Sequence, residues 1–346
     1  MKLESVFSGR PGTFIIAELS ANHNGSYKRA ERTIKEMKAA GADAVKMQTY
    51  TPDTITLDCD NRYFRIRSGT LWDGRTLYDL YREAQTPWEW QPRLKKYAES
   101  LGLAWFSSPF DTTAVDFLEK LKVPAYKIAS FEITDIPLIS YVASKGKPVM
   151  ISTGIASPAE IRSAVQACLD AGNRRIALLK CTSAYPASVE DANLRTIPDM
   201  VSRFGVIAGL SDHTLGSAVP VAAVALGARV VEKHFTLDRK TGGPDAAFSL
   251  EPREFNAMVR AIREAERALG RVDYSLPENA ARNRVFARSL FVVRDIRKGE
   301  RFTSDNVRSI RPGCGLPPGR IASVIGKKAA ESIRRGTPLA RRHITR

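Results

Sequence analysis

The chain has 346 residues, of which 43% are hydrophobic and 26% charged, and its formal net charge is +16. This length suits one (β/α)8 barrel with a small appendage, and the composition is ordinary for a globular protein. No stretch approaches the roughly 20 apolar residues of a membrane helix. Residues 1–14 lack the apolar region of a signal peptide, so we expect a cytoplasmic protein without a membrane partner.

The positive charge by itself would suit a nucleic-acid binder. The basic residues are spread along the chain, however, apart from modest clusters such as Arg334–Arg335 and Arg341–Arg342. No helix-turn-helix, zinc-finger or RNP pattern occurs. A basic surface around a site for a multiply anionic small molecule is the simpler interpretation, and we expect no nucleic-acid partner.

The four cysteines, Cys59, Cys168, Cys181 and Cys314, are scattered and form no C-x-x-C pair. A disulfide framework or a zinc knuckle would need paired spacings. We therefore predict four free thiols, some of them packed in the core.

Short apolar runs typical of buried strands recur along the chain. In order they cover residues 14–19, 44–49, 104–109, 125–130, 148–153, 176–183, 206–212 and 230–236. Helical patterns separate them, for example residues 28–40, closed by Gly41, and residues 157–171, which begin with the Ser-Pro pair of a capped helix. Eight strands that alternate with helices pair in parallel through crossovers, which predicts an α/β fold with a TIM (β/α)8 barrel.

Residues 52–87 interrupt this rhythm after the second predicted strand. The segment is too long for a plain loop in a compact domain. We expect it to build a lid or a wall of the substrate site.

The pattern changes again after residue 270. We predict a barrel domain over residues 1–270, a linker over residues 271–288 and a small, basic, β-rich domain over residues 289–346. The last domain has few large apolar residues, so we expect it to lean on another surface for stability. His343 lies in its basic tail, where we expect it to be solvated.

Polar side chains recur where the predicted strands end. Catalytic groups of a barrel lie at the carboxyl ends of its strands, so this recurrence predicts an active site there. In chain order the side chains are Glu18, Ser20, Asn22, His23, Lys46, Gln48, Ser107, Ser108, Lys127, Ser130, Glu132, Ser152, Thr153, Lys180, Thr182, Ser183, Ser211, Asp212, His213, Glu232, Lys233 and His234.

His213 and His234 fall at the ends of neighbouring predicted strands, and the chain has only four histidines. Two imidazoles so placed can share a divalent metal, with Glu18 or Glu232 and water as further ligands. Either histidine alone would more commonly be a hydrogen-bonded packing residue. The matched positions favour the metal site, whereas His23 could be a ligand, a substrate contact or a residue that orders its loop.

Lys46 and Lys127 lie inside otherwise apolar strands, where a lysine is rarely buried without a partner. One interpretation is an internal ion pair with Glu18, Glu132 or Glu232. The other is a clamp for a phosphate or carboxylate, in which hydroxyl groups add neutral donors. Those hydroxyl groups would come from Ser130, Ser152, Thr182 and Ser183. Both interpretations can hold, since the charges of such a network orient one another.

Eight motifs occur in the order found in N-acetylneuraminate-type synthases, and the chain resembles this family over nearly its whole length. The motifs are AELSANHNG, VKMQTY, FSSPFD, YKIASFEI, ISTG, LLKCTSAYP, GLSDHT and VEKHFTLD. The C-terminal RPGCGLPP is similar to the antifreeze-like (SAF) domain that ends those enzymes. The resemblance implies a TIM barrel followed by a SAF domain, phosphoenolpyruvate as donor, and a divalent metal, Mn²⁺ in first place with Mg²⁺ or Co²⁺ as alternatives.

The resemblance also implies roles for single residues. His213 and His234 would hold the metal, and Glu18, Glu132 and Glu232 complete the predicted catalytic set, with Glu132 assisting proton transfer or sugar binding. Which glutamate acts on water or protons stays open. The predicted substrate-binding residues are Lys46, Gln48, Ser108, Lys127, Ser130, Ser152, Lys180, Thr182, Ser183, Tyr185, Ser211, Asp245 and Arg311. The resemblance further implies a homodimer in which each SAF domain caps the partner's barrel, with Arg311 reaching the sugar.

Two segments, Gly69–Trp90 and Gly242–Pro252, resemble the pseudaminic acid branch of this family. The sialic acid branch usually has GPDH where this chain has GPDA, Asn in place of Ser183, and Glu in place of Asn24. The resemblance therefore implies condensation of phosphoenolpyruvate, 2,4-diacetamido-2,4,6-trideoxy-L-altrose and water to pseudaminic acid and phosphate. Synthesis of N-acetylneuraminate or legionaminate from another amino-sugar aldehyde is the alternative.

Two rival functions fit the sequence less well. A barrel synthase of 3-deoxy-ulosonic acid phosphates would not need the SAF-like segment. An ice-binding or carbohydrate-binding protein would not need chemically equipped ends on eight strands.

Overall fold

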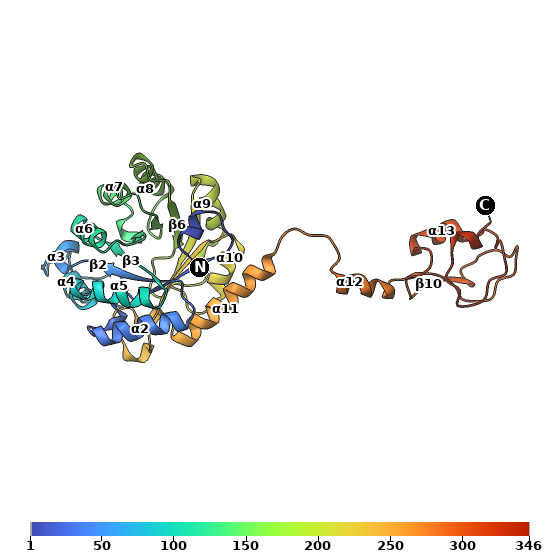
Figure 1. The fold of residues 1–346 in the computed structure, drawn as a ribbon, viewed down its shortest axis with the longest axis horizontal. Helices are drawn as coiled ribbons and strands as arrows, with labels where there is room; N and C mark the ends of the chain where they lie inside the picture. The colour runs from blue at the N-terminus through green and yellow to red at the C-terminus, as the bar shows by residue number, and fades with distance from the viewer. Residues whose placement is uncertain (1, 346) are drawn as a thin grey trace. The chain divides into compact units, whose positions relative to one another are not determined.

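The computed structural model describes residues 2–345, and eight of its strands form one closed parallel barrel (Figure 1). The strands are β1 (Phe14–Glu18), β2 (Ala44–Thr49), β3 (Ala104–Pro109), β4 (Tyr126–Ile128), β5 (Val149–Ser152), β6 (Ile176–Cys181), β7 (Ile207–Asp212) and β8 (Val230–His234). Each strand pairs with the next, and β8 closes the ring on β1 with Glu18 opposite His234. The predicted TIM barrel is confirmed.

Helices surround the barrel and bury their apolar faces against it. They are α2 (Tyr27–Ala39), α5 (Gln91–Ser100), α6 (Thr112–Lys120), α7 (Ile136–Ser144), α8 (Pro158–Asp170), α9 (Thr196–Phe204), α10 (Ala218–Ala225) and α11 (Pro252–Leu269), with the short α1 (Glu4–Phe7) ahead of them. Phe14 and Trp105 are fully buried in the shared core. Burying a side chain of this size contributes about 1.5–3 kcal/mol, so this core holds strands and helices together.

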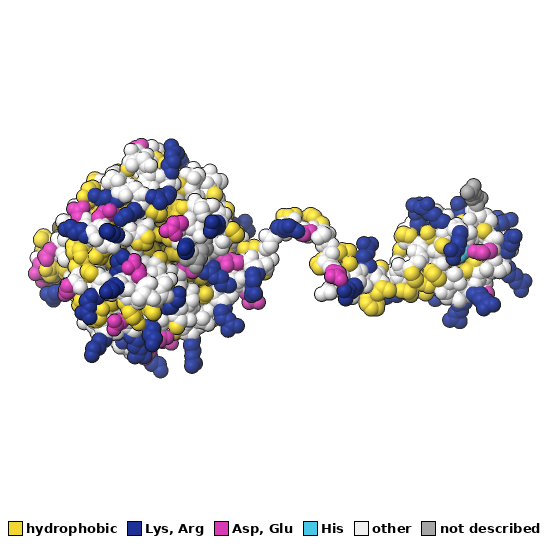
Figure 2. All heavy atoms as spheres, viewed as in Figure 1, with side chains coloured by type: hydrophobic (Ala, Val, Ile, Leu, Met, Phe, Trp, Pro, Cys, Tyr) yellow, Lys and Arg dark blue, Asp and Glu magenta, His cyan; other side chains and the backbone are white. Residues whose placement is uncertain are grey.

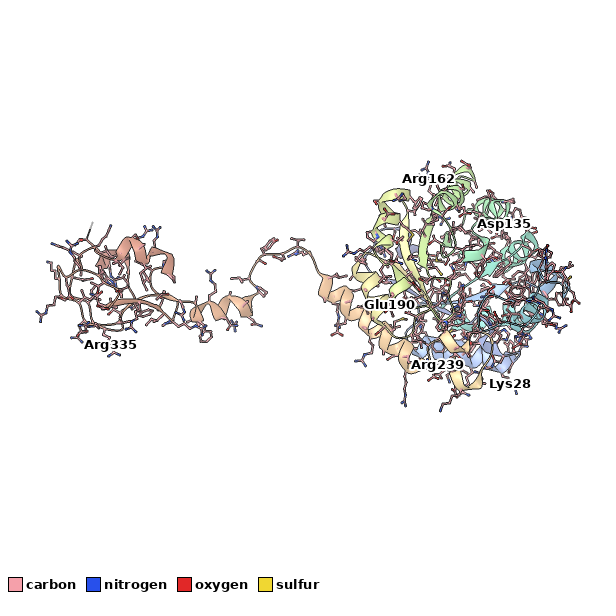
Figure 3. All side chains as sticks on the ribbon, turned by 180° about the vertical axis from the view of Figure 1, so that it is seen from behind. Lys28, Asp135, Arg162, Glu190, Arg239 and Arg335 are labelled. Carbon is pink, nitrogen blue, oxygen red and sulfur yellow. The ribbon has the colours of Figure 1, made fainter. Side chains whose placement is uncertain are left out.

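Local hydrogen bonds from N-cap residues, which can be recognised in the sequence, fix where helices begin. Ser157 caps α8, and its hydroxyl and the Glu160 carboxylate form the reciprocal capping box ahead of Pro158. Asp135, labelled in Figure 3, caps α7 without a reciprocal bond, because its carboxylate accepts the backbone N–H of Leu138 at 3.1 Å. The helix predicted over residues 157–171 is therefore present, with Ser157 outside it as the cap.

The segment after β2 folds into α3 (Pro52–Ile55), an irregular loop, α4 (Leu77–Ala84) and the short 3-10 helix η2 (Trp88–Trp90). Asp73 organises the loop, since its carboxylate accepts backbone N–H groups from Ser68, Gly69 and Thr70 at 2.9–3.1 Å. These local bonds replace the regular structure that the segment lacks.

Residues from Arg271 onward form a second compact unit. Its β9 (Ser289–Val292) and β10 (Val307–Ile310) pair antiparallel, and α13 (Ile321–Val324) follows. The predicted linker contains a short helix, α12 (Glu278–Arg282), and belongs with this unit by its contacts. Despite its few large apolar residues the unit has a core of its own, made of Leu290, Val292, Ile296, Phe302, Val307, Val324, Ala329, Ile333 and Leu339.

The prediction that His343 is solvated is wrong, because its side chain is buried and only 4% exposed. Its Nδ1 accepts the backbone N–H of Ala340 at 3.1 Å, and its Nε2 lies 3.6 Å from the Glu331 carboxylate. The basic residues around His343 in the sequence suggested an exposed tail. The residue lies in a short 3-10 turn, η9 (Arg341–His343), from which its ring points inward.

Lys and Arg side chains are scattered over the visible face of each unit, as expected from the sequence (Figure 2). All four cysteines are free, and Cys168 and Cys181 are buried, as predicted. In the part of the chain that the structure describes, no helix combines the length and apolar character needed to cross a lipid bilayer.

Candidate active site

Four inward-facing side chains at the carboxyl end of the barrel form a buried charged cluster. Glu18, Lys46, Lys127 and Glu232 are each at most 3% exposed. Lys46 Nζ lies 3.0 Å from Glu18 Oε2 and 3.2 Å from Glu232 Oε1. Lys127 Nζ lies 3.3 Å from the same Glu232 oxygen. The predicted internal ion pairs are thus confirmed with Glu18 and Glu232 as the carboxylates.

Neutral groups on neighbouring strands extend this cluster. Ser108 Oγ accepts a bond from Lys46 Nζ at 3.4 Å, and Ser211 Oγ donates to Glu232 Oε1 at 3.3 Å. Gln48 Nε2 donates to Ser20 Oγ at 3.0 Å. The strand register brings these groups together, since Gln48 stands opposite Ser108 and Ser211 opposite Glu232.

The charges of the cluster are unequal. Burial raises the pKa of Glu18 to about 7, against the attraction of Lys46. Burial also opposes ionisation of Glu232, but Lys127 and Lys46 overcome it and bring the pKa of Glu232 down to about 2. Burial lowers the pKa of Lys127, whereas in Lys46 burial is outweighed by the attraction of Glu18 and Glu232, which raises the pKa. An anionic ligand beside the two amino groups would favour their charged forms.

The two predicted metal ligands lie side by side at the ends of β7 and β8. The rings of His213 and His234 have centroids 5.3 Å apart. His213 Nδ1 lies 3.0 Å from the Thr182 carbonyl oxygen, a contact that assigns its proton to Nδ1 and leaves Nε2 as the ligand atom. His234 Nδ1 is buried and has no hydrogen-bond partner in the described chain.

The donor set therefore fits a divalent ion. Burial, followed by the nearby His213, sets the pKa of His234 well below its usual value, so this imidazole is neutral and able to bind metal. Among the described residues no group of three or more His, Cys, Asp or Glu side chains surrounds one point. Further ligands of an ion held by the two histidines would then come from water or substrate.

A cavity of about 390 Å³ lies at the strand ends. The predicted site residues that line it are Gln48, Ser130, Glu132, Tyr185, His234 and Asp245. Burial raises the pKa of Glu132 to about 7, and its Oε2 has no hydrogen-bond partner among the described residues. Asp245 Oδ2 accepts the backbone N–H of Ala21 at 3.3 Å, and burial raises the pKa of this carboxyl group too.

The segment after β2 supplies an apolar side of the cavity, which we call the insertion wall: Ile55, Ile66, Trp72, Leu77, Leu80 and Ala84. Trp72 Nε1 donates to the Pro244 carbonyl at 3.0 Å, and its ring centroid lies 5.4 Å from that of Tyr185. The segment therefore forms a wall of this cavity, and its role as a substrate wall stays a prediction.

Ser183 and Ser130 approach the same backbone segment at Gly154, and Ser152 ends β5 two residues before it, although neither Ser152 nor Ser183 lines the cavity. Ser152 Oγ is buried and has no hydrogen-bond partner among the described residues, so it remains available to a ligand. A Cβ at Gly154 would lie 2.1 Å from Ser183 Oγ and 2.9 Å from Ser130 Oγ. Only glycine leaves room here for two hydroxyl groups to approach one backbone segment.

Two further predicted residues of the barrel, Lys180 and Thr182, make hydrogen bonds to backbone carbonyl groups. Lys180 Nζ donates to the Cys181 carbonyl at 3.0 Å, and Thr182 Oγ1 donates to the Asp191 carbonyl at 3.2 Å. Neither side chain lines the cavity, and the same holds for Lys46 and Lys127. Arg311 is exposed on the second unit.

Some residues of the site escaped the sequence analysis. Cys181 was predicted as an ordinary free thiol, yet its Sγ lies 3.9 Å from His213 Nδ1. The cavity is also lined by Tyr50, Tyr81, Phe110, Phe131 and Phe248. In a sequence, aromatic residues on strand-end loops cannot be distinguished from core residues. Of these five, only Tyr81 lies in the segment that was predicted to form a wall.

Of the three alternatives for His23, a ligand, a substrate contact or a residue that orders its loop, the geometry favours the third. Its Nδ1 accepts the backbone N–H of Gly25 at 3.1 Å, and its Nε2 lies 3.2 Å from Thr86 Oγ1. The ring is fully buried and therefore orders its loop against the segment after β2.

Comparison with known proteins agrees with this geometry. A pseudaminic acid synthase of Campylobacter jejuni subsp. jejuni serotype O:23/36 (strain 81-176) is 49% identical over 326 residues, which cover 94% of this chain and 95% of that protein. A pseudaminic acid synthase of Helicobacter pylori is 46% identical over 333 residues, covering 96% and 98%. The crystal structure of an N-acetylneuraminic acid synthetase from Leptospira borgpetersenii, in complex with citrate, superposes with a TM-score of 0.70 at 31% identity, covering 78% and 90%.

Family models divide the chain as its structure does. The NeuB family model matches residues 33–274, which span most of the barrel, and the SAF domain model matches residues 287–344, which contain the second unit's core. With both matches and full-length relatives at nearly half identity, the chain belongs to the NeuB family and is an enzyme of the sialic acid synthase type.

Proposed function

We propose that this enzyme condenses phosphoenolpyruvate with 2,4-diacetamido-2,4,6-trideoxy-L-altrose and water, giving pseudaminic acid and phosphate. The observation that carries the proposal is the pair of buried amino groups, Lys46 and Lys127, that share one oxygen of Glu232 at the strand ends, where a cavity with an apolar wall also lies. The first feature suits a doubly anionic donor and the second suits a deoxy sugar with acetamido groups. The similarity to two pseudaminic acid synthases supports the same reaction.

The donor would bind through charge and neutral hydrogen bonds. Lys46 and Lys127 hold its phosphate and carboxylate, and the hydroxyl groups of Ser130, Ser152 and Ser183 complete the anion site. Fixing the donor in this way sets C3 of phosphoenolpyruvate against the sugar aldehyde and removes the entropy cost of the encounter.

In the reaction, C3 of phosphoenolpyruvate forms a bond to the aldehyde carbon, and the aldehyde oxygen takes up a proton. Water adds to the cationic C2 and loses a proton, and phosphate leaves with its bridging oxygen. Glu132 is suited to hold or move one of these protons, because its pKa of about 7 lets it exist in both forms near neutral pH.

His213 and His234 would hold a divalent metal, which we propose is Mn²⁺, with Mg²⁺ or Co²⁺ as alternatives. The ion supplies Lewis acidity toward the aldehyde oxygen when it is bound. The buried, neutral His234 with its unpartnered Nδ1 supports this assignment.

The test is a phosphate-release assay with phosphoenolpyruvate, Mn²⁺ and a panel of amino-sugar aldehydes. The proposed sugar should give the highest kcat/KM. A higher value for N-acetylmannosamine or for the legionaminate precursor would assign the enzyme to one of those reactions instead. No phosphate release with any sugar would overturn the synthase proposal.

A further inference from the structure

The cavity is lined from two parts of the chain. Its polar groups come mainly from the barrel and its strand-end loops: Ser20, Gln48, Ser130, Glu132, His234 and Asp245. The same loops also contribute the rings of Phe110, Phe131 and Phe248, whereas the insertion wall comes entirely from the segment between β2 and α5. A ligand that contacts the insertion wall therefore meets a surface made almost entirely of hydrocarbon.

The insertion wall offers few hydrogen bonds to a ligand. The indole N–H of Trp72 already donates to the Pro244 carbonyl. The Thr70 hydroxyl, which also lines the cavity, donates to Asp73 at 3.0 Å. Tyr81 also lines the cavity, with a ring that packs edge-on against Tyr50 at a centroid distance of 5.7 Å and a hydroxyl group that does not belong to the wall as defined. A ligand hydroxyl group placed against the six side chains of the insertion wall would lose water and gain no hydrogen bond from them in return.

Trp72 also ties the wall to the loop that carries Asp245. The ring is presented by the Asp73-centred loop, in which Thr70 Oγ1 accepts the backbone N–H of Trp72 at 3.3 Å. On the other side of the Asp245 loop, Asn24 Nδ2 donates to the Gly242 carbonyl at 2.9 Å. A Cβ at Gly243 would lie 2.5 Å from Asn24 Oδ1, so this side of the loop is closely packed.

We propose that the insertion wall selects the substituent at C6 of the amino sugar, and that Trp72 is the specificity-determining residue. This inference rests on the proposed synthase function and deepens it. A methyl group at C6 lies against the wall without cost, whereas a hydroxymethyl group buries a hydroxyl with no partner. Trp72 acts twice, because its ring forms part of the wall and its N–H positions the loop of Asp245.

The experiment compares two amino-sugar aldehydes that differ only at C6, one 6-deoxy and one 6-hydroxy. The wild-type ratio of kcat/KM should favour the 6-deoxy sugar by about 10- to 100-fold, the discrimination that one small group supports. Ile66→Thr, which exchanges part of an apolar side chain of the wall for a hydroxyl group, should reduce the ratio several-fold. Leu71→Thr is the matched control, because Leu71 belongs to the same loop but is 55% exposed and lies outside the cavity lining.

Two variants separate the roles of Trp72. Trp72→Phe keeps an aromatic ring and loses the hydrogen bond, so the KM for the sugar should rise about 5-fold while the KM for phosphoenolpyruvate stays unchanged. Trp72→Ala should raise the sugar KM further and reduce the C6 ratio. A general structural defect would instead alter both KM values and leave the ratio intact.

The outcomes distinguish this inference from the proposed function. Wild-type ratios retained in both Ile66→Thr and Trp72→Ala would overturn the role of the wall while leaving the synthase reaction in place. A wild-type enzyme that prefers the 6-hydroxy sugar would do the same. Absence of phosphate release with either sugar would remove the proposed function and this inference together.

Discussion

At the scale of single residues, the buried lysines carry the clearest consequence. Lys127 has Glu232 as its ion-pair partner, whereas Lys46 contacts both Glu18 and Glu232. Replacing either lysine leaves a buried carboxylate less well compensated, and under the proposed function it also removes a charge-assisted bond to the donor. We therefore expect the loss of Lys46 to destabilise the fold more than the loss of Lys127.

We predict that Lys127→Met raises the KM for phosphoenolpyruvate about 10- to 100-fold, because a hydrogen bond to a charged group contributes about 1.5–3 kcal/mol. The KM for the sugar should change much less. Steady-state kinetics with each substrate varied in turn checks this, and circular dichroism confirms that the variant is folded. An unchanged donor KM in a folded Lys127→Met enzyme would mean that the lysine serves only the ion pair.

The two histidines lead to a prediction about metal binding. His213→Ala removes one of the two imidazoles whose ring centroids lie 5.3 Å apart, so Mn²⁺ affinity should fall at least 10-fold. Titration calorimetry of chelator-treated protein with Mn²⁺ measures this without reference to turnover. Activity should vanish on chelation and return with Mn²⁺ in the wild type. Full activity in metal-free His213→Ala would refute the metal site.

Glu132 makes stability depend on pH. Its folded pKa of about 7 lies above its ordinary value of 4.5, so the folded state holds a proton that the unfolded state has lost within that window. Stability should therefore fall as pH rises from 4.5 to 7, by at most about 1.4 kcal/mol per pH unit for this group. Glu232, with its pKa lowered to about 2, acts oppositely and costs stability as pH falls below 4.5.

The check is Glu132→Gln, which cannot ionise. Its melting temperature should decline less between pH 5 and pH 7.5 than that of the wild type. The same slope in both proteins would show that the Glu132 carboxyl group is not the source of the dependence.

Single residues also show what a sequence can and cannot reveal. The inward direction of Lys46 and His234 could be predicted. Side chains of a strand alternate between its two faces, and the barrel fold decides which face points inward. The contact of Cys181 with His213 depends on the direction of the His213 side chain, which lies beyond the end of β7, and the burial of His343 depends on a short 3-10 turn. No periodicity governs the direction of either histidine, so neither feature could be predicted.

At the scale of elements, β7 and β8 are joined by a buried pair behind the two histidines. Lys233 is fully buried and donates to the Asp212 carboxylate and the Thr214 carbonyl. Asp212 precedes His213 in the chain and Lys233 precedes His234. Because neighbouring strand residues point to opposite faces, this pair fixes the two strand ends from outside the barrel.

We predict that Lys233→Met lowers the free energy of unfolding by about 3–5 kcal/mol, since it leaves the Asp212 carboxylate buried without its cation. Urea denaturation measures the loss. The double variant Lys233→Met/Asp212→Asn should recover part of it, because no unpaired charge remains. A loss below about 1 kcal/mol in the single variant would show that the pair is not strongly coupled to folding.

The elements themselves followed the sequence closely where hydrophobic periodicity was strong. The strand predicted over residues 125–130 ends at Ile128, because Ser130 begins the 3-10 turn η3 (Ser130–Glu132) that turns toward the cavity. The segment 52–87 was recognised as a wall, but its loop is held by the carboxylate of Asp73. Such a loop depends on one side chain, and no repeating pattern marks it.

At the scale of the whole molecule, the division into a barrel and a SAF unit was visible as a change of pattern near residue 270. What the pattern concealed was the second unit's own core around Phe302, because its nine buried members are spaced irregularly. An irregular spacing has no helical or strand period from which burial could be inferred.

We propose that the enzyme is a homodimer in which Arg311 completes the partner's site. The residue is exposed, and the forming cation at C2 requires that bulk water be kept from the barrel end. Mixing inactive Arg311→Ala chains with inactive His213→Ala chains should restore about a quarter of wild-type activity under random exchange, because half of the dimers are mixed and each has one intact site. Exchange without any return of activity would place Arg311 outside the partner's site.

The insertion wall and the polar groups of the cavity lie in different parts of the chain, which has a consequence for how the sugar specificity of this enzyme can evolve. The groups suited to the chemistry are anchored in the barrel strands, where a change disturbs the core and the ion pairs together. The insertion wall belongs to a segment outside the barrel strands, whose loop is held by local hydrogen bonds to Asp73 and by the bond from Trp72 to Pro244. Natural drift or directed evolution can therefore exchange the accepted sugar by altering this one segment, while the catalytic machinery and the stability of the barrel are inherited unchanged.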